Sequence, residues 1–389
     1  MLAWIAPLVV FGLVVFVHEF GHFLAAKIVG VYTPRFSIGF GRALFKKRYG
    51  ETEYVLAALP LGGYVRMASK DDETTAFIEG GSENAATAVT AKGEALDPNA
   101  MIPFGPKPIP PDRWLESKPL WARLFILLSG VTMNVVLALV VTTLMLLRYG
   151  LPYVSTITES VSPNRPAVMA GMRAGDSLVA IDGVPLQSWD SLVSKISSSA
   201  NRELVFDVRR SGQSIRIPIT PAPDTATNLT TGKLEHVGRV GILPKQLSRP
   251  VGLGEAMTKG WGLTWGMAGS VIEALRGLAT RKVAASELGG PIMIATASVQ
   301  AARSGLENLM VLISLISVNL AVFNLLPIPI LDGGQILVQV LEAIKGKAFS
   351  VRTREYILRA GLFAVLLLFA LVTYNDLRRL VVSLMEKFG

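Results

Sequence analysis

The chain has 389 residues, of which 51% are hydrophobic and 17% charged, and its mean hydropathy is +0.46. This balance excludes an ordinary soluble enzyme and indicates a membrane protein with room for one soluble module. The net charge of +9 would suit a nucleic-acid-binding protein, but many basic residues flank apolar segments, where orientation in a membrane explains them; no nucleic-acid partner is expected. The absence of cysteine excludes disulfides and leaves His, Asp and Glu as metal ligands.

Four apolar segments predict about four transmembrane helices: residues 2–29, 121–147, 306–330 and 357–374. Basic residues cluster after the first segment and before the second, so the positive-inside rule places the intervening residues in the cytoplasm and the N-terminus outside. Alternation of the spans then places residues 148–305 outside and residues 331–354 inside. Three basic residues after the fourth span fall on the wrong side, which leaves the side of the C-terminal tail open: Arg378, Arg379 and Lys387.

The first apolar segment contains the sequence HEFGH, residues 18–22. His18 and His22 project from the same face of a helix, so both imidazoles can bind one tetrahedral metal ion, with Glu19 beside them as a general base. The same pattern can also occur by chance in a helix where it only packs. The apolar surroundings favour the metal site, because an ionisable residue inside a membrane span is expensive to bury and is functional by default.

Residues 53–67 predict two short strands around a turn that contains Pro60, Gly62 and Gly63. This hairpin is unusually apolar, so we expect a re-entrant element that packs against the helices. The following residues, 69–111, are rich in Ala, Gly, Thr and acidic residues and have little to bury. They predict a flexible cytoplasmic loop that continues to about residue 120.

A soluble β-rich module is predicted over residues 151–245. Three short β-like runs alternate there with Gly/Asp turns: residues 179–181, 204–208 and 215–219. One helix fits residues 188–198. The sequence AVMAGMRAGDSLVAIDG, residues 167–183, resembles the signature of PDZ domains in bacterial membrane and envelope proteases, with another small β-rich domain as the alternative. A PDZ domain binds peptide C-termini by adding them as a strand, which predicts that the module screens or tethers substrate outside the membrane.

Residues 251–280 contain Trp261, Trp265 and Lys259 among many glycines. Trp and Lys favour the membrane interface, so we expect interfacial helices here and not a fifth span. A fifth span here would reverse the direction in which the third apolar segment crosses the membrane.

The third apolar segment ends in the sequence NLLPIPILDGG, residues 324–334. Two prolines break the helix, and Gly333 and Gly334 are expected to permit an abrupt turn. Asp332 follows the break directly and is predicted to be a third metal ligand, because two His and one carboxylate with an open fourth position form a catalytic zinc site. A helix cap is the structural alternative for Asp332. If the first and third spans run in the same direction, the two motifs meet near the cytoplasmic face.

Several motifs together resemble the bacterial site-2 protease family of intramembrane zinc metalloproteases: HEFGH, LPLGGYVRM (residues 59–67), the PDZ-like module, ELGGPI (residues 287–292) and NLLPIPILDGG. The resemblance covers nearly the whole chain. It implies an inner (cytoplasmic) membrane endopeptidase in which His18, His22 and Asp332 hold Zn²⁺ and Glu19 is catalytic. The implied substrates are single-pass membrane proteins, either anti-sigma factors or remnant signal peptides. The chain departs from the best-known member in having one PDZ-like module instead of two, and its long loop has no counterpart.

The resemblance also implies substrate contacts. An Asn at the position of Asn324 contributes to the active site in the family. Asn134, in the second span, resembles another family position, for which substrate contact and helix–helix hydrogen bonding are equally good roles. A substrate helix must unwind before cleavage, and the hairpin with Gly62 and Gly63 is expected to hold the unwound segment by strand addition.

The predicted fold is a polytopic α-helical membrane protein of about four transmembrane helices in the lipid bilayer, with a re-entrant β-hairpin and an inserted extracytoplasmic PDZ domain of the β-rich α+β class. The predicted parts are residues 1–68 (first span and hairpin), 69–120 (loop), 121–150 (second span), 151–245 (PDZ domain), 246–305 (interfacial helices and linker) and 306–389 (third and fourth spans).

Three other functions stay open at this point. A non-catalytic scaffold could present the PDZ module, although an intact Glu19 argues against it. A transporter is possible for any polytopic protein, but no internal repeat supports it. In a membrane zincin of another family, a downstream glutamate would complete the site, and the candidates are Glu273, Glu287, Glu342 and Glu355.

Overall fold

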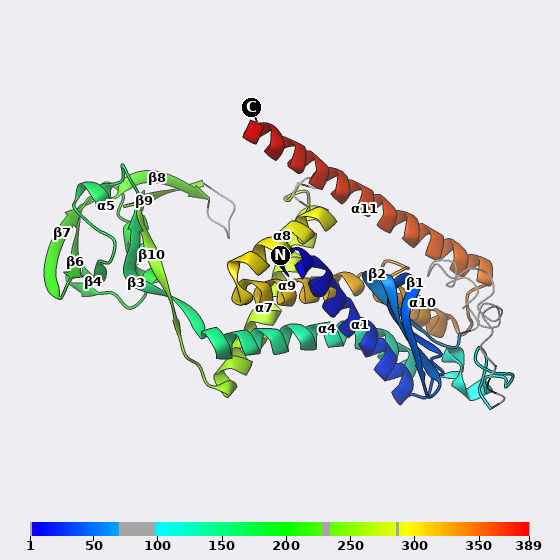
Figure 1. The fold of residues 1–389 in the computed structure, drawn as a ribbon. Coiled ribbons are helices and arrows are strands. Elements are labelled where there is room, and N and C mark those ends of the chain that lie inside the picture. The colour runs from blue at the N-terminus through cyan, green and yellow to red at the C-terminus, as the bar shows by residue number, and fades with distance from the viewer. Residues whose placement is uncertain (1, 70–96, 98, 228–233, 285–287, 389) are drawn as a thin grey trace. The chain divides into compact units, whose positions relative to one another are not determined.

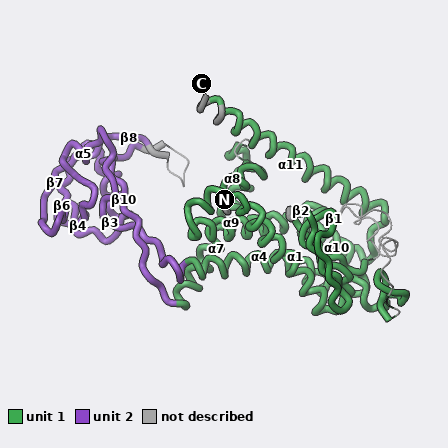
Figure 2. The backbone as a smooth tube through the Cα atoms, viewed as in Figure 1, with its two compact units in different colours: residues 1–145, 253–389 green, residues 146–252 purple. Residues whose placement is uncertain are grey.

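The structure is a computed structural model that describes residues 2–69, 97, 99–227, 234–284 and 288–388. It divides into two compact units, coloured separately in Figure 2. The first unit comprises residues 1–145 and 253–389, and the second comprises residues 146–252.

Helices dominate the first unit (Figure 1): α1 (Ala6–Ile28), α4 (Leu120–Tyr149, whose last turn enters the second unit), α7 (Leu253–Ala279), α8 (Pro291–Ser304), α9 (Leu306–Asn324), α10 (Asp332–Lys345) and α11 (Val351–Phe388). Short 3₁₀ helices are η1 (Leu2–Ile5), η3 (Pro111–Arg113) and η4 (Leu115–Ser117). Within the described ranges, four helical segments are long and apolar enough to cross a membrane: Ala3–Ile28, Leu120–Tyr149, Leu306–Asn324 and Val351–Val382. All four predicted segments are therefore helical, but the third ends at Asn324, because the prolines after it cannot continue the hydrogen-bonded ladder.

The apolar core of the helices lies between α1 and α9. Val10 and Val14 of α1 pack there against Ile313 and Ile316 of α9, and side chains of α4 and α8 surround them. Apart from Phe23, the buried positions of α1 lie along one helix face: Ala6, Val10, Val14, His18, Gly21, His22, Ala25 and Ala26. The face that carries the core therefore also carries both histidines into the bundle.

Residues 251–280 were predicted as interfacial helices and form one continuous helix, α7. Ala268 of α7 packs in a single apolar cluster with Ala138 of α4 and Val318 of α9. The buried residues of α7 form a stripe with a spacing of four, and each of them is small: Ala256, Gly260, Thr264 and Ala268. A stripe of small residues lets α7 approach its neighbours closely.

The start of α8 is bound to α11 by a single carboxylate. Asp376 of α11 is 4% exposed and accepts hydrogen bonds from the backbone N–H groups of Gly290, Ile292 and Met293, each at 3.0 Å. These N–H groups have no partner within their own helix, so the carboxylate satisfies them and complements the helix dipole. A Cβ on Gly290 would lie 2.8 Å from Asp376 Oδ2, which explains a glycine at this position.

Two long strands, β1 (Arg35–Tyr49) and β2 (Thr52–Arg66), form a sheet beside α1. The predicted hairpin within residues 53–67 is confirmed only in part: residues 53–56 and 63–66 are two β segments on either side of the turn, but each pairs with β1, which was not predicted, and not with the other. Residues 35–38 pair with residues 53–56 on one side and with residues 63–66 on the other. Pro60 and the glycines interrupt β2 between these two halves, where the backbone can bend. Among the described residues, the segment 63–66 pairs on one side only and forms an edge of the sheet.

Glu51, in the turn between β1 and β2, ties the sheet to the chain before α4. It accepts two hydrogen bonds from the Arg113 guanidinium, at 2.7 and 2.9 Å, and pairs with Lys27 at the end of α1. Burial would raise the pKa of Glu51, but the hydrogen bonds from Arg113 and Lys27 outweigh it, so this pKa lies below its ordinary value. Most of the predicted flexible loop, residues 70–96 and 98, lies outside the described residues.

The second unit consists mainly of strands: β3 (Leu151–Val161), β4 (Ser177–Ile181), β5 (Val184–Pro185), β6 (Leu204–Arg210), β7 (Gln213–Ile219), β8 (Ala222–Thr227), β9 (Leu234–Arg239) and β10 (Ile242–Arg249). Its two helices are α5 (Pro166–Met169) and α6 (Trp189–Ser197). The sheet has the antiparallel order β10-β3-β4-β6-β7, with β5 paired to β4, and β8 and β9 form a separate ribbon. The three predicted β runs and the predicted helix are confirmed, since they lie in β4, β6, β7 and α6.

A buried carboxylate and a partly exposed arginine form an ion pair in the second unit. The Asp176 side chain is 1% exposed and accepts hydrogen bonds from Arg210 Nε at 2.7 Å and from the Arg173 N–H at 2.8 Å. Arg210 also donates to the carbonyl of Gly171 at 2.8 Å. Burial would raise the pKa of Asp176, but these hydrogen bonds outweigh it and hold the pKa below its ordinary value. The predicted turn around Asp176 is thus a fixed part of the fold.

Candidate metal centre

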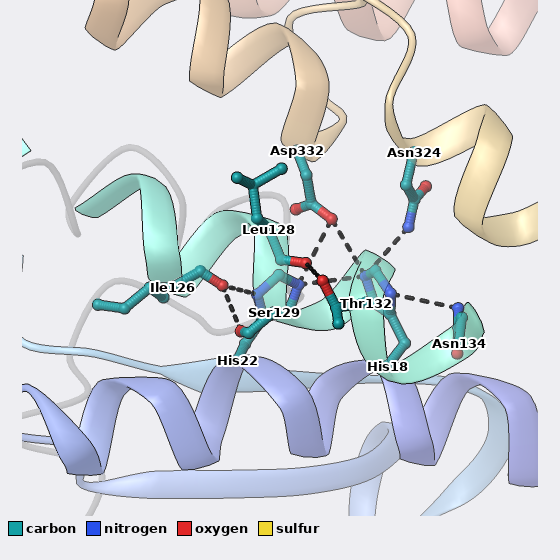
Figure 3. Close-up of polar contacts among 9 residues, drawn as sticks. All are labelled: His18, His22, Ile126, Leu128, Ser129, Thr132, Asn134, Asn324 and Asp332. Atoms are coloured by element: carbon teal, nitrogen blue, oxygen red, sulfur yellow. Dashed lines mark hydrogen bonds and ion pairs between the residues drawn. The ribbon is translucent and has the colours of Figure 1, made fainter. Parts of the chain in front are cut away.

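Three side chains from α1 and α10 meet at one point (Figure 3). The Nε2 atoms of His18 and His22 are 3.2 Å apart, and Asp332 Oδ2 lies 3.3 Å from the first and 3.5 Å from the second. The three side chains are 7%, 9% and 14% exposed. In the part of the chain that the structure describes, no other His, Asp and Glu side chains form a cluster of this kind.

This triangle of atoms fits a zinc ion. With zinc bonds of about 2.0–2.1 Å in tetrahedral geometry, ligand atoms lie about 3.3–3.4 Å apart, close to the three distances seen here. Asp332 Oδ2 is buried without a hydrogen-bond partner among the described residues, which is costly unless a cation is bound there. Two imidazole nitrogens and one carboxylate oxygen also form a donor set that suits zinc.

Asp332 does not act as a helix cap. It is the first residue of α10, Leu331 occupies the N-cap position, and no side chain caps the helix. The expectation that Gly333 and Gly334 permit an abrupt turn is wrong, because both lie in helical backbone and neither has a positive φ. Their role is close approach: a Cβ on Gly333 would lie 2.3 Å from the Leu325 carbonyl oxygen. The start of α10 can thereby rest on the loop after α9, which directs Asp332 to the histidines.

Helix α4 holds the outer side of both imidazoles. His22 Nδ1 donates to the carbonyl of Ile126 at 2.8 Å, so its Nε2 carries a lone pair. His18 Nδ1 lies 3.4 Å from the side-chain amide of Asn134, which is completely buried. The Asn324 amide lies 3.0 Å from His18 Nε2 and is partly exposed. Figure 3 shows these contacts on two sides of the histidine pair.

Gly130 of α4 packs directly on the imidazoles, and the sequence analysis did not single it out. A Cβ at this position would lie 2.4 Å from His22 Nε2 and 2.8 Å from His18 Cε1. Gly21 allows the same close approach from α1, since a Cβ there would lie 2.5 Å from the Ser129 carbonyl oxygen. The available signal was spacing: Gly130 and Asn134 are four residues apart and share one helix face.

The edge of the β-sheet passes beside Glu19. A Cβ on Gly63 would lie 3.3 Å from Glu19 Cγ and 2.7 Å from the Ser37 carbonyl oxygen. The backbone N–H of Val65 interacts favourably with the Glu19 carboxylate. A Cβ on Gly62 would lie 2.2 Å from the Phe40 ring. Gly63 therefore lets the strand come close to the side chain predicted to be the general base, and Gly62 makes room for the Phe40 ring.

The glutamates of the alternative zincin that the structure describes do not join this cluster. Glu342 pairs with Arg354 at 2.8 Å. Glu355 pairs with Arg359 on an exposed face of α11, and Glu273 is exposed on α7. Glu287 lies outside the described residues.

Comparison with known proteins agrees with this arrangement. The chain matches Peptidase family M50 over residues 6–368. It is 29% identical over 422 residues to the regulator of sigma-W protease RasP of Bacillus subtilis, covering 97% of this chain and 98% of the relative. It is also 29% identical over 424 residues to the zinc metalloprotease RasP of Bacillus licheniformis, covering 97% of this chain and 99% of the relative. Family membership and the four apolar helices indicate a multi-pass membrane protein. The chain thus belongs to peptidase family M50, the site-2 proteases, and is a zinc-dependent metalloprotease.

Proposed function

We propose that this metalloprotease cleaves the transmembrane segments of single-pass membrane proteins inside the lipid bilayer. One observation carries the proposal: His18, His22 and Asp332 meet within 3.5 Å of one another, and both histidines lie on a helix apolar enough to cross a membrane. A peptide bond that reaches this point must itself lie among the helices.

His18, His22 and Asp332 would hold the zinc ion. When bound, zinc supplies Lewis acidity that lowers the pKa of a water to about 7 and polarises the scissile carbonyl. Glu19 takes the proton of the attacking water and delivers it to the leaving amine. Asn324 stands beside the ligands with its amide 3.0 Å from His18 Nε2, where it can donate to an oxygen of the substrate or intermediate.

The sheet edge supplies the substrate-binding surface. A helical substrate hides its carbonyls in its own hydrogen bonds, so the segment to be cleaved must unwind. The unwound segment pairs with residues 63–66, whose other side already pairs with β1. Gly63 keeps this edge close to Glu19 and Gly62 lets it pass the Phe40 ring, so an added strand would pass the general base.

The second unit acts as the PDZ domain in this proposal. It binds peptide C-termini by strand addition and screens or tethers substrates on the extracytoplasmic side. The active site then lies toward the cytoplasmic side of the bacterial inner membrane. The name of the Bacillus subtilis relative connects that protein with sigma-W regulation, which favours anti-sigma factors as one substrate class here. Remnant signal peptides are the other class.

Exchange of Glu19 for Gln tests the proposal. The purified full-length protein is incubated in liposomes with a single-pass membrane protein substrate, and zinc content is measured beside cleavage. Glu19→Gln should keep its zinc and lose cleavage by about 10²–10⁴-fold, the usual contribution of a general base. The matched control is Glu355→Gln, which changes an exposed charge on α11 and should alter neither quantity. Unchanged cleavage in Glu19→Gln would reject the mechanism.

Exchange of Asp332 for Ala tests the ligand assignment. Asp332→Ala should lose zinc and cleavage together, because it removes the carboxylate from the triangle. Full zinc occupancy in Asp332→Ala would show that another group completes the site. A zinc-loaded wild-type protein that cleaves soluble peptides but no transmembrane segment would contradict the intramembrane assignment while leaving the protease activity intact.

A further inference from the structure

We infer that Asn134 is a positioning residue whose Oδ1 accepts a hydrogen bond from His18 Nδ1–H and thereby fixes the imidazole tautomer that presents Nε2 to zinc. The inference rests on the proposed zinc ligands and adds to them a residue that touches neither substrate nor metal.

The first observation is an unsatisfied buried atom. Asn134 is 0% exposed, and its side-chain amide faces His18 Nδ1 across 3.4 Å with the nitrogen Nδ2. Its oxygen, Oδ1, is buried and has no hydrogen-bond partner within the described part of the chain. A buried carbonyl oxygen without a donor costs about 1–3 kcal/mol. In the present orientation of the amide, Oδ1 therefore lacks a hydrogen bond that would offset this cost.

The second observation is the hydrogen bonding of His18 itself. Its Nε2 accepts a hydrogen bond from Asn324 Nδ2 at 3.0 Å and faces Asp332 Oδ2 at 3.3 Å. A neutral imidazole carries one proton, so a ring that accepts at Nε2 has its proton on Nδ1. A metal ligand requires the same tautomer, since the lone pair on Nε2 makes the bond.

These two observations have one solution. An Nδ1–H group cannot pair with the N–H₂ of an amide, because both are donors. The oxygen and nitrogen of an Asn side chain have nearly the same shape and are assigned from their hydrogen bonds. Turning the Asn134 amide by half a rotation places Oδ1 against His18 Nδ1–H. The His18 Nδ1–H donor then has an acceptor and Oδ1 has a partner, while Nδ2 moves to the place that Oδ1 held.

The other histidine shows the same arrangement. His22 Nδ1 donates to the Ile126 carbonyl at 2.8 Å, and this acceptor also comes from α4. Ile126, Gly130 and Asn134 are spaced by four residues and lie along one face of that helix. The first and last supply an acceptor for each imidazole, and the glycine between them makes room for both rings. Outer hydrogen bonds of this kind orient metal-binding histidines and affect metal affinity about 10–100-fold.

A role in helix packing alone does not need this side chain. The hydrogen bond between α4 and α9 at this position uses the main chain, because Ser317 Oγ donates to the Asn134 carbonyl at 2.8 Å. A direct substrate contact would need exposed surface, and Asn134 has none. The structure therefore favours contact of Asn134 with His18 over both predicted roles, substrate contact and helix–helix hydrogen bonding.

The test measures zinc affinity of the full-length protein in detergent by competition with a chromophoric chelator. Asn134→Leu has a similar volume but no acceptor and should weaken zinc binding about 10–100-fold. Asn134→Asp supplies only acceptors and should restore affinity to the wild-type level or above. Ser317→Ala is the matched control: it removes the helix-packing hydrogen bond to the same residue and should leave zinc affinity unchanged.

Thermal unfolding of the zinc-free proteins shows which variants are folded, and Asn134→Ala replaces Asn134→Leu if the latter does not fold. Wild-type zinc affinity in a folded Asn134→Leu or Asn134→Ala protein would overturn the inference. Weak zinc binding by a folded Asn134→Asp protein would overturn it too, because an acceptor alone should suffice. These results are distinguishable from failure of the zinc assignment, in which the wild-type protein and His18→Ala would bind zinc equally.

Discussion

Replacement of Gly130 by Ala should weaken zinc binding at the histidines without disturbing the rest of the fold. The new Cβ would lie 2.4 Å from His22 Nε2, 2.6 Å from His22 Cε1 and 2.8 Å from His18 Cε1, whereas ordinary contacts begin near 3.4 Å. The imidazoles or the helix must therefore move by about 1 Å. Metal–ligand distances tolerate deviations of about 0.2 Å, so a shift of this size cannot be absorbed with zinc bound.

The size of the effect follows from the cost of overpacking. One extra methyl group in a close-packed site costs about 1–3 kcal/mol. Rotation of the imidazoles away from the zinc position relieves this strain, so the strain opposes zinc binding. At 1.4 kcal/mol for each factor of ten, zinc affinity should fall about 5–150-fold. Cleavage should fall at least as much at limiting zinc.

The assay compares zinc dissociation constants and cleavage rates of the wild-type protein and Gly130→Ala. Gly12→Ala is the control, because it makes the same exchange inside α1 where nothing lies within 4 Å of the new Cβ. The control should keep wild-type zinc affinity and gain about 0.5–1 kcal/mol of stability from the better helix former. Wild-type zinc affinity and activity in Gly130→Ala would refute the close packing of α4 on the histidines.

Three further predictions concern other parts of the molecule. Asp376→Ala should lower the stability of the detergent-solubilised protein by more than about 3 kcal/mol in thermal unfolding, because three buried N–H donors lose their acceptor at about 1–3 kcal/mol each; a loss below 1 kcal/mol would contradict this cap. Because the pKa of Asp176 is lowered, its pairing with Arg210 stabilises the second unit fully above about pH 4 and is lost as the pH falls through the lowered pKa. Protection of residues 146–252 from hydrogen exchange, corrected for the intrinsic exchange rate, should therefore fall at acid pH in the wild-type protein and depend less on pH in Asp176→Asn; equal pH dependence would argue against the ion pair. Removal of zinc by a chelator should abolish cleavage and its return should restore it, since zinc supplies the Lewis acid; cleavage that survives complete removal would contradict a zinc-dependent reaction.

Local sequence patterns predicted those features of the protein that depend only on residues close together in the chain. Long apolar runs predicted the four helices, since a membrane span is defined by length and hydrophobicity. The four-residue spacing of His18 and His22 predicted that their imidazoles share a face, and their Nε2 atoms lie 3.2 Å apart. Alternating short runs and turns predicted three strands and one helix of the second unit. In each case a local sequence pattern is enough to predict the element, without knowledge of its tertiary contacts.

For some elements the sequence predicted the type of secondary structure but not the segment that it pairs with or packs against. Residues 53–67 were recognised as β-structure, but their pairing with β1 depends on contacts that no local pattern encodes. Gly333 and Gly334 were expected to serve a turn. Their actual constraint is the backbone of the loop after α9, which only the packed structure brings near.

Tertiary structure decided how the groups around the histidines are arranged. Asp332 was placed at the metal centre from its position after a broken helix, and the structure brings its Oδ2 within 3.5 Å of both rings. The four-residue spacing of Ile126, Gly130 and Asn134 places them on one face of α4, but it does not say whether that face lies against α1. The side that faces α1 is set by the rotation of one helix against another, which depends on the packing of every residue along the interface.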